Sequence, residues 1–507
     1  MSQRYLIGIG WLAILALALW LRVHKLGERP MHADEATGAR ILSNLLEDNN
    51  YSFDPKHYHG PFLSYSSSIL STVTGETNWN ELSKKGLRIG PALAGILLTL
   101  TPLIWVRHIG HPATLAAAAL LASSPLLVYY NRMYIHESWL ALFAMLACGL
   151  GYRLLNRPQG STAILTGVSI GLMFATKETF VISVLSWGVA TVTFSLALLK
   201  YQQDHSVHLR RVSYIKPVTL LTLSFIFTAT LFYSNGFRSV NGVIDAVRTY
   251  FVYETSAGHN KSAVYYLELM LQPKNRLGLW WTEISVALLC LIAFVAAFVH
   301  SSRRSTVLFL ASTVAAHVAI YSLISYKTPW LMLVPWAHAC LLAGLAIQQL
   351  GLFSRTIRAT IILVLLVTLM HQTQQSILAS GNFANDSRNP YAYVATSKDA
   401  EALENWLTQL QELETADQFN PVAVVGNGYW PLPWYLRKFD TVGYWSAPTD
   451  TMTTYPIIIT MPEHEETATE LLSASHIALP RGLRSNFSIT VFLRNDIWHK
   501  WSETPSR

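Results

Sequence analysis

Charged residues are scarce in this sequence. They make up 13% of the 507 residues, while 51% are hydrophobic. Soluble proteins carry roughly twice that charged fraction. The apolar residues gather in blocks of about 18–22, and each block is long enough to cross a bilayer as a helix. Because a soluble core rarely holds such long uncharged segments, the composition excludes an ordinary soluble enzyme and predicts a polytopic membrane protein.

Cysteines are few, and several cofactor motifs are absent. The three cysteines, Cys148, Cys290 and Cys340, all fall inside predicted spans, so no disulfide framework is expected. The sequence has no GxxxxGK(S/T) loop, no CxxC pair and no HExxH, so the usual parts for ATP hydrolysis and zinc-protease chemistry are missing. We expect no nucleotide cofactor. The net charge of +7 comes from Lys and Arg in short loops between spans, which indicates contact with membrane lipids and no nucleic-acid partner.

About eleven apolar segments are predicted to span the membrane as helices. They cover residues 5–22, 87–106, 112–130, 138–155, 162–178, 181–199, 217–234, 280–299, 305–325, 330–350 and 357–375. The first is longer than a signal-peptide core and has no small-residue cleavage site after it, so we expect an uncleaved signal anchor. Lys and Arg are enriched in alternate short loops, which favours a cytoplasmic N-terminus and an extracytoplasmic C-terminus.

The predicted division is a membrane domain, residues 1–375, followed by a soluble extracytoplasmic α/β domain, residues 376–507. The membrane domain has two long outer loops, 23–86 and 235–279. The cations of loop 235–279 run against the charge bias, so either the span count is wrong there or they meet an anionic substrate. Within the first loop, "ADEATGARILSNLLEDNN" reads as an amphipathic helix lying on the outer leaflet. In the tail, "SKDAEALENWLTQLQEL" and "EHEETATELLSAS" predict helices, and "VAVVG" and "YPIIIT" predict strands.

Charged residues at the ends of the spans converge on the predicted outer face. They are Asp34, Glu35, Arg132, Glu137, Lys177, Glu178 and Lys327. Ionisable groups at such positions are costly and usually have a partner or a function. Each also has a structural interpretation: an N-cap for Asp34, ion pairs for Arg132 with Glu137 and for Lys177 with Glu178, and snorkelling for Lys327. Their convergence on one face favours a site.

The segment "DPKHYHGPFLSY" adds a second group of titratable residues. Lys56, His57 and His59 have the chemistry to hold a phosphate or a metal ion, and the two histidines lie on one side of an extended strand. The alternative is a polar surface loop. Trp330, in "YKTPWLMLVPW", is an aromatic candidate for stacking on a sugar, although a core or interfacial position is the more common role.

Several of these motifs, in this order, resemble those of the GT-C membrane glycosyltransferases. The group is family 39/83, the protein O-mannosyltransferases and aminoarabinose transferases, and "ATKE", "YKTPW" and "WPLPWYLR" are most similar to the flippase-activity-associated subfamily. "HADEA" resembles the acidic motif of the first outer loop, which makes Asp34 the matching base. "HGPFLSY" resembles a Lys-Pro-Pro-Leu-x-Tyr phosphate motif, with His59 and Gly60 in place of Lys and Pro. In "YNRMYIHE", Glu137 stands where the family has Asp.

The resemblance implies an inverting transfer of a sugar from a polyprenyl-phosphate donor to an acceptor hydroxyl on a protein, glycan or lipid. Asp34, with Glu35 beside it, is the expected catalytic acid pair. Lys56, His59, Arg132, Lys177 and Lys327 are expected to bind the donor phosphate, supported by His57, Glu137, Glu178 and Trp330. Some relatives use a divalent cation and others do not, so the metal stays open. A lipid-linked sugar flippase and a non-catalytic accessory subunit are the alternatives.

Overall fold

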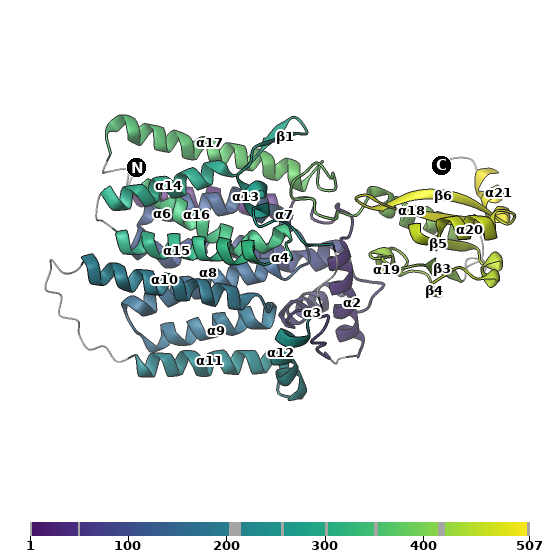
Figure 1. The fold of residues 1–507 in the computed structure, drawn as a ribbon, viewed down its shortest axis with the longest axis horizontal. Coiled ribbons are helices and arrows are strands. Elements are labelled where there is room, and N and C mark those ends of the chain that lie inside the picture. The colour runs from purple at the N-terminus through teal and green to yellow at the C-terminus, as the bar shows by residue number, and fades with distance from the viewer. Residues whose placement is uncertain are drawn as a thin grey trace.

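The computed structural model describes residues 3–48, 51–201, 214–254, 258–299, 303–348, 353–413 and 421–503. Long helices lie side by side along one axis and form a bundle (Figure 1). The described N-terminus lies at one end of this bundle, and a small sheet domain lies beyond the other end. We call the end that faces the sheet the domain end.

Each of the eleven predicted spans corresponds to a helical segment. They are α1 (Gln3–Val23), α4 (Lys84–Leu98) with η1 (Thr101–Trp105) and α5 (Val106–Ile109), α6 (His111–Ser123) with α7 (Pro125–Asn131), α8 (Glu137–Asn156), α9 (Gly160–Thr176), α10 (Phe180–Tyr201), α11 (Ile215–Tyr233), α14 (Ile284–Val299), α15 (Arg304–Leu323), η2 (Pro329–Met332) with α16 (Leu333–Gln348), and α17 (Arg355–Ser380). Within the described residues, eight helices are long and apolar enough to cross a membrane, or nine if the bent pair α6–α7 is one span; α9 and α14 are shorter apolar helices. The chain is a multi-pass membrane protein.

The span predicted as one helix over 112–130 is in fact broken. Helices α6 and α7 meet at an angle of 57°. Ser124 at the break has an extended backbone, with ψ 121°, and it precedes Pro125. A proline disfavours the helical conformation of the residue before it, so the local sequence explains the bend. The break gives the Ser124 side chain a partner outside its own helix, the Glu283 carboxylate, at 2.9 Å.

The short elements α2 (Ala33–Asp48), α3 (Phe62–Thr74), α12 (Asn241–Val252), α13 (Tyr265–Met270) and the hairpin β1 (Lys274–Arg276)–β2 (Leu279–Trp281) belong to the two predicted outer loops. Figure 1 shows α2, α3 and α12 at the domain end, between the bundle and the sheet. The prediction that α2 lies on the outer leaflet is wrong. Its apolar residues Ala36, Ala39 and Leu42 are fully buried in a core shared with the C-terminal domain, because protein rather than lipid covers that face.

The C-terminal domain is a five-stranded sheet with helices on both faces. Its elements are α18 (Lys398–Leu413), β3 (Val422–Val425), α19 (Leu432–Tyr435), β4 (Val442–Trp445), η5 (Asp450–Thr454), β5 (Ile457–Thr460), η6 (Pro462–His464), α20 (Glu465–Leu472), β6 (His476–Arg484), β7 (Phe487–Arg494) and α21 (Asn495–Glu503). The strand order is β4-β3-β5-β7-β6, parallel from β4 to β5 and antiparallel from β5 to β6. The predicted helices α18 and α20 and strands β3 and β5 are confirmed, while the hairpin β6–β7 was not foreseen.

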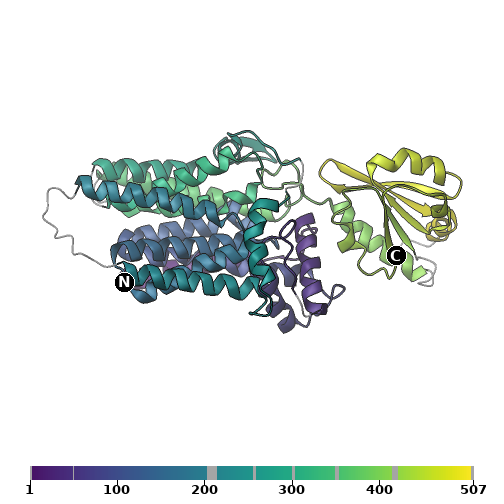
Figure 2. The ribbon, with the colours of Figure 1, turned by 60° about the horizontal axis from the view of Figure 1, so that its bottom comes forward.

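Hydrogen bonds with the segment before α2 hold the C-terminal domain against the bundle. Figure 2 shows the C-terminal domain beyond the end of the bundle where the purple helices of the first outer loop lie. The Met31 N–H donates to the Tyr435 hydroxyl at 2.9 Å, and the Thr396 hydroxyl donates to the Met31 carbonyl at 2.6 Å. Lys84 and Glu401 form an ion pair across the same junction. The segment before α2 therefore lies between the two parts of the molecule, and its position depends on both.

Candidate active site

A cavity of about 330 Å³ at the domain end brings most of the predicted site residues together. Its walls come from α2, the loop before α3, the α7–α8 and α9–α10 junctions, the end of α12 and the segment before α16. Seven of the predicted site residues line it: Asp34, His57, His59, Glu137, Lys177, Glu178 and Trp330. They come from five separate stretches of the sequence, so only the fold makes them neighbours.

The start of α2 leaves the Asp34 carboxylate available. His32 occupies the N-cap position: its carbonyl accepts from the Ala36 N–H, and its ring Nδ1 accepts from the Asp34 N–H at 3.1 Å. Because Nδ1 accepts a hydrogen bond and Nε2 lies 3.2 Å from the Tyr393 carbonyl, this geometry requires the Nε2–H tautomer of the ring. Its 4.0 Å approach to the Asp34 carboxylate is therefore not a charged pair. The N-cap role considered for Asp34 belongs to His32, and the Asp34 side chain is 54% exposed.

Glu35 does not reach the cavity, so its predicted role in catalysis is not supported. Its carboxylate is fully buried and accepts Arg88 Nε at 2.7 Å and Nη2 at 2.8 Å, a two-point ion pair. It also accepts the backbone N–H groups of His32 and Tyr134. Burial opposes its charge, but Arg88 outweighs burial and lowers the pKa of Glu35 to about 2. The neighbour of Asp34 on the helix points about 100° away and anchors α2.

The His59 ring reaches the cavity because the loop before α3 packs against the end of α9. A Cβ on Gly60 would lie 2.2 Å from the Ala175 carbonyl oxygen, so only glycine fits this approach. His59 Nδ1 lies 3.0 Å from Glu178 Oε2, and the ring stacks on Tyr253 with centroids 5.4 Å apart. Burial opposes the charge of Glu178, but His59 outweighs burial and lowers the pKa of Glu178 to about 2.

Lys177 and Glu137 form a buried ion pair at the floor of the site. Lys177 Nζ donates to Glu137 Oε1 at 2.5 Å, and their side chains are 7% and 4% exposed. Burial disfavours the Lys177 charge, but Glu137 and Glu178 outweigh burial and raise the pKa of Lys177 above its usual value. The structural alternative considered for Lys177, an ion pair with Glu178, is not what the structure shows, since Lys177 pairs with Glu137. An ammonium has three donors, so Lys177 keeps hydrogens for a ligand.

Three of the predicted phosphate-binding cations do not line the cavity. Arg132 donates to the carbonyls of Leu21, His24 and Lys25 at the end of α1 instead of pairing with Glu137. Lys327 is buried and its Nζ donates to the carbonyls of Lys261, at 3.3 Å, and of Ile324. Both cations donate to backbone carbonyls, and neither forms the anionic contact that the sequence suggested within the described residues.

Lys56 stays at the rim of the site. Its side chain is exposed and lies 3.4 Å from Glu254 Oε1. Glu254 itself lines the cavity, and its other oxygen is 3.8 Å from His57 Nε2. Lys56 is thus close to the cavity entrance but is already paired.

Sequence reasoning missed several residues of this cavity. Tyr253 and Glu254 follow α12, in the predicted outer loop 235–279, of which only the cations were considered. Tyr326 lies next to Lys327 in the sequence. His136 immediately precedes Glu137, and its ring meets that of His59 edge to face at 5.1 Å. Burial, together with the charges of His59 and Lys177, lowers the pKa of His136 well below its usual value. The only signal for His136 in the sequence was its place beside an acid at a span end.

The charges of the cavity identify one acid without a cation. Glu137 is paired with Lys177, Glu178 with His59, and Glu254 with Lys56. Among the described lining residues, Asp34 is the carboxylate that has no basic partner other than the neutral His32 ring. In the part of the chain that the structure describes, no three His, Cys, Asp or Glu side chains are grouped to hold a metal ion. We therefore derive no step through a metal.

This bundle with its appended sheet domain has a fold of the GT-C type, which the following solved structures share. Known structures with the same fold cover nearly the whole chain. ArnT from Cupriavidus metallidurans in the apo state aligns with a TM-score of 0.64 at 14% identity, covering 97% of this chain and 99% of that chain. The same protein bound to undecaprenyl phosphate gives 0.61 at 16% identity, covering 96% and 99%.

An archaeal oligosaccharyltransferase shows the same fold at lower similarity. AglB from Archaeoglobus fulgidus, in complex with an inhibitory peptide and a dolichol-phosphate, aligns with a TM-score of 0.52 at 14% identity, covering 98% of this chain and 77% of that chain. The family model for dolichyl-phosphate-mannose-protein mannosyltransferase matches residues 58–223. No curated protein sequence matches the chain significantly. The predicted GT-C resemblance is confirmed, and the narrower subfamily stays a prediction.

Proposed function

We propose that this protein transfers a sugar from a polyprenyl-phosphate donor to an acceptor hydroxyl at the outer face of the membrane, with inversion at the sugar. The observation that carries the proposal is the pairing pattern of the cavity. The exposed Asp34 carboxylate, with no Lys or Arg partner, shares one cavity with Lys177 and His59, and each of the other lining acids is paired with a Lys or His side chain. A base and a group of phosphate-stabilising donors are what such a transfer needs.

Asp34 is the proposed general base. Its carboxylate takes the proton of the acceptor hydroxyl as the acceptor oxygen forms a bond to the anomeric carbon of the sugar. The bond between that carbon and the phosphate oxygen breaks on the opposite side, so the configuration inverts. The exposure of the Asp34 side chain gives the acceptor access, and its position on the second residue of a capped helix fixes its direction.

Lys177 and His59 are the proposed partners of the leaving phosphate. The polyprenyl phosphate leaves with the electron pair of the broken bond, and the ammonium of Lys177 and the His59 ring, whose Nε2 lies 3.5 Å from the Tyr253 hydroxyl, stabilise its charge. Glu137 and Glu178 are positioning residues, because they hold these two side chains in place. Trp330, 5% exposed, forms an apolar wall of the same cavity and is proposed to contact the sugar.

The likeness to proteins with lipid-phosphate ligands supports this choice of donor. ArnT was solved with undecaprenyl phosphate and AglB with a dolichol-phosphate and a peptide. We infer the same class of donor here, and we propose that the N-terminus is cytoplasmic and that the C-terminal domain, with the cavity, is extracytoplasmic. The assay below identifies the donor sugar, and the acceptor is a protein, glycan or lipid supplied by the membrane extract.

The test is release of polyprenyl phosphate by the purified full-length protein in detergent. A panel of polyprenyl-phosphate sugars is incubated with membrane extract as the source of acceptor, using wild type, Asp34→Asn and the control Asp48→Asn. Asp48 is the exposed last residue of the same helix, outside the cavity. We expect release by wild type and Asp48→Asn and loss of at least 100-fold in Asp34→Asn, in line with removal of a general base.

Two results contradict the proposal. Release that persists in Asp34→Asn removes Asp34 as the base. No release from any donor, with movement of the intact lipid-linked sugar between leaflets of reconstituted vesicles, replaces transfer by the flippase alternative.

A further inference from the structure

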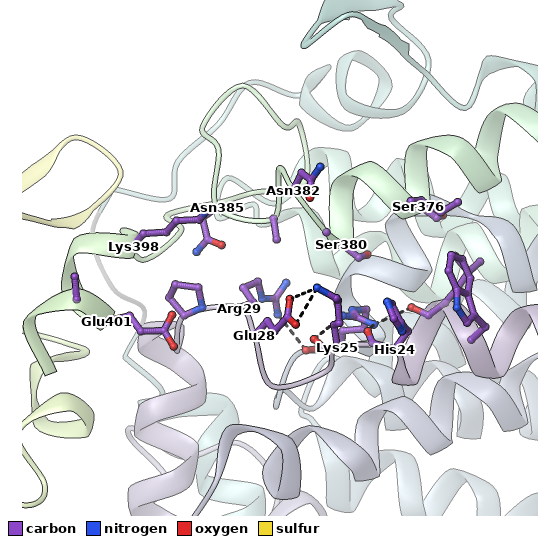
Figure 3. Close-up of a pocket in the computed structure, with 18 of the residues that line it drawn as sticks. His24, Lys25, Glu28, Arg29, Ser376, Ser380, Asn382, Asn385, Lys398 and Glu401 are labelled. Carbon is purple, nitrogen blue, oxygen red and sulfur yellow. Dashed lines mark hydrogen bonds and ion pairs between the residues drawn. The ribbon is translucent and has the colours of Figure 1, made fainter. Parts of the chain in front are cut away.

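A second polar cavity lies at the junction of α1, α17 and α18, apart from the candidate active site. Its volume is about 390 Å³, and no residue that lines it also lines the Asp34 cavity. Figure 3 shows Lys25, Glu28 and Arg29 at the end of α1 on one side and Lys398 and Glu401 of α18 on the other. The cavity is thus formed jointly by the membrane bundle and the C-terminal domain. We call it the junction cavity.

Positive charge dominates the junction cavity. Four cations line it, Lys25, Arg29, Arg132 and Lys398, against two carboxylates, Glu28 and Glu401. Glu28 is paired with Lys25, and Glu401 with Lys84 from outside the lining. Three cations, Arg29, Arg132 and Lys398, therefore have no carboxylate partner among the described residues.

Two of these cations are crowded together. Arg29 Nη2 donates to the Arg132 carbonyl at 3.1 Å, and the Arg29 guanidinium lies over the Tyr129 ring at 4.7 Å. Burial, together with the charges of Arg29 and Arg88, lowers the pKa of Arg132 to about 10. The charge of Glu28 acts on Arg132 in the opposite direction, but neither arginine forms a salt bridge with a carboxylate among the described residues. Such neighbouring arginines can bind a phosphate, which accepts several N–H groups at once.

An apolar groove of about 580 Å³ joins this cavity. It runs between α1 and α17 and shares Ile377 with the junction cavity. Its other lining residues are Leu17, Leu369, Met370 and Leu378, with the polar Thr373 and Gln374. Met370 and Ile377 are 75% and 44% exposed, and both helices are candidate membrane spans. In a bilayer this groove faces the hydrocarbon, while the cations lie at the level where a span ends and headgroups begin.

We propose that the junction cavity binds the phosphate of an anionic phospholipid, whose acyl chains occupy the groove between α1 and α17. The cations of the junction cavity favour an anionic headgroup. Because the cavity continues into the apolar groove, it favours a ligand with acyl chains over free phosphate. The residues Arg29 and Pro30 line this cavity and lead directly into the α2 segment that carries Asp34. A lipid here bridges the bundle and the C-terminal domain. The proposal stands independently of the sugar-transfer proposal.

The experiment measures lipid binding to the full-length protein in an uncharged detergent. Fluorescent phosphatidylglycerol is titrated and followed by anisotropy, with phosphatidylcholine as the zwitterionic comparison and inorganic phosphate as competitor. The test variants are Lys25→Gln/Lys398→Gln and Ile377→Trp. The control is Lys216→Gln/Lys438→Gln, which removes two exposed lysines that do not line the cavity.

We expect phosphatidylglycerol to bind wild type and the control equally and more tightly than phosphatidylcholine. The double variant at the cavity should bind about 30-fold more weakly, since one basic side chain near an anionic headgroup contributes roughly fivefold. Ile377→Trp should also weaken binding, without any change of charge. Equal binding of the two lipids, or equal loss in the control, overturns the proposal. Displacement of the lipid by millimolar phosphate overturns the assignment to a lipid and leaves a phosphate site.

Discussion

Replacement of Glu35 by Gln tests how the start of α2 is held. The substitution keeps the shape of the side chain but removes the charge that faces Arg88, and both side chains are completely buried. Breaking a buried ion pair by removing one partner costs about 3–5 kcal/mol, because the other charge stays behind unpaired. The pKa gives a similar figure. Its drop from 4.5 to about 2 corresponds to about 3 kcal/mol at about 1.4 kcal/mol per pKa unit.

The same numbers fix the pH dependence. Since the pKa of Glu35 is lower in the folded protein than in the unfolded chain, its contribution is complete above about pH 4.5 and is lost as the pH falls toward 2. Above that range, the difference between wild type and Glu35→Gln should not change with pH. As the pH falls from about 4.5 toward 2, the free energies of unfolding of wild type and Glu35→Gln should converge.

The assay is unfolding of the purified protein in mixed detergent micelles, monitored by tryptophan fluorescence at several pH values. The matched control is Glu28→Gln, in which the lost partner is Lys25 in an ion pair more than half exposed, and such pairs contribute about 0–1 kcal/mol. A loss of less than about 1 kcal/mol in Glu35→Gln, equal to the control, would refute the assignment of Glu35 as the anchor of α2 and reopen its role in catalysis.

Three further substitutions test the site and its supports. Gly60→Ala should lower the melting temperature and the activity, because its Cβ meets a backbone carbonyl at 2.2 Å, whereas Gly188→Ala, where nothing lies within 4 Å, should be neutral or stabilising. Lys177→Gln should reduce release of polyprenyl phosphate by about 100- to 1000-fold, the usual loss for one electrostatic donor; a fall under tenfold would contradict contact with the phosphate. Glu283→Ala should destabilise the bundle by more than about 2 kcal/mol in chemical unfolding, because it removes the acceptor of four buried side-chain donors. These donors belong to Ser124, Trp336, Gln372 and Tyr391. An unchanged unfolding midpoint would show that these hydrogen bonds do not stabilise the bundle.

The local sequence determined the helices and their order. Long apolar blocks dictate spans, because backbone groups in a bilayer must bond within their own segment, and each of the eleven predicted segments corresponds to a helical segment among the described residues. The bend at Ser124 was also encoded locally, by Pro125, although it was not foreseen. The position of Asp34 in the first turn of α2 was readable from the acids that start an apolar periodic segment.

Pairing between distant residues was decided only by the tertiary structure. Glu35 and Asp34 look equivalent in sequence. In the structure, Arg88, 53 positions from Glu35, forms an ion pair with Glu35, while the Asp34 side chain stays exposed. Lys177 binds Glu137 rather than its neighbour Glu178, and Arg132 and Lys327 donate to backbone carbonyls outside the Asp34 cavity. The physical reason is that a buried charge must find a partner wherever the packing of helices places one. Hydropathy fixes which helices form, while the choice of partner depends on how their ends meet.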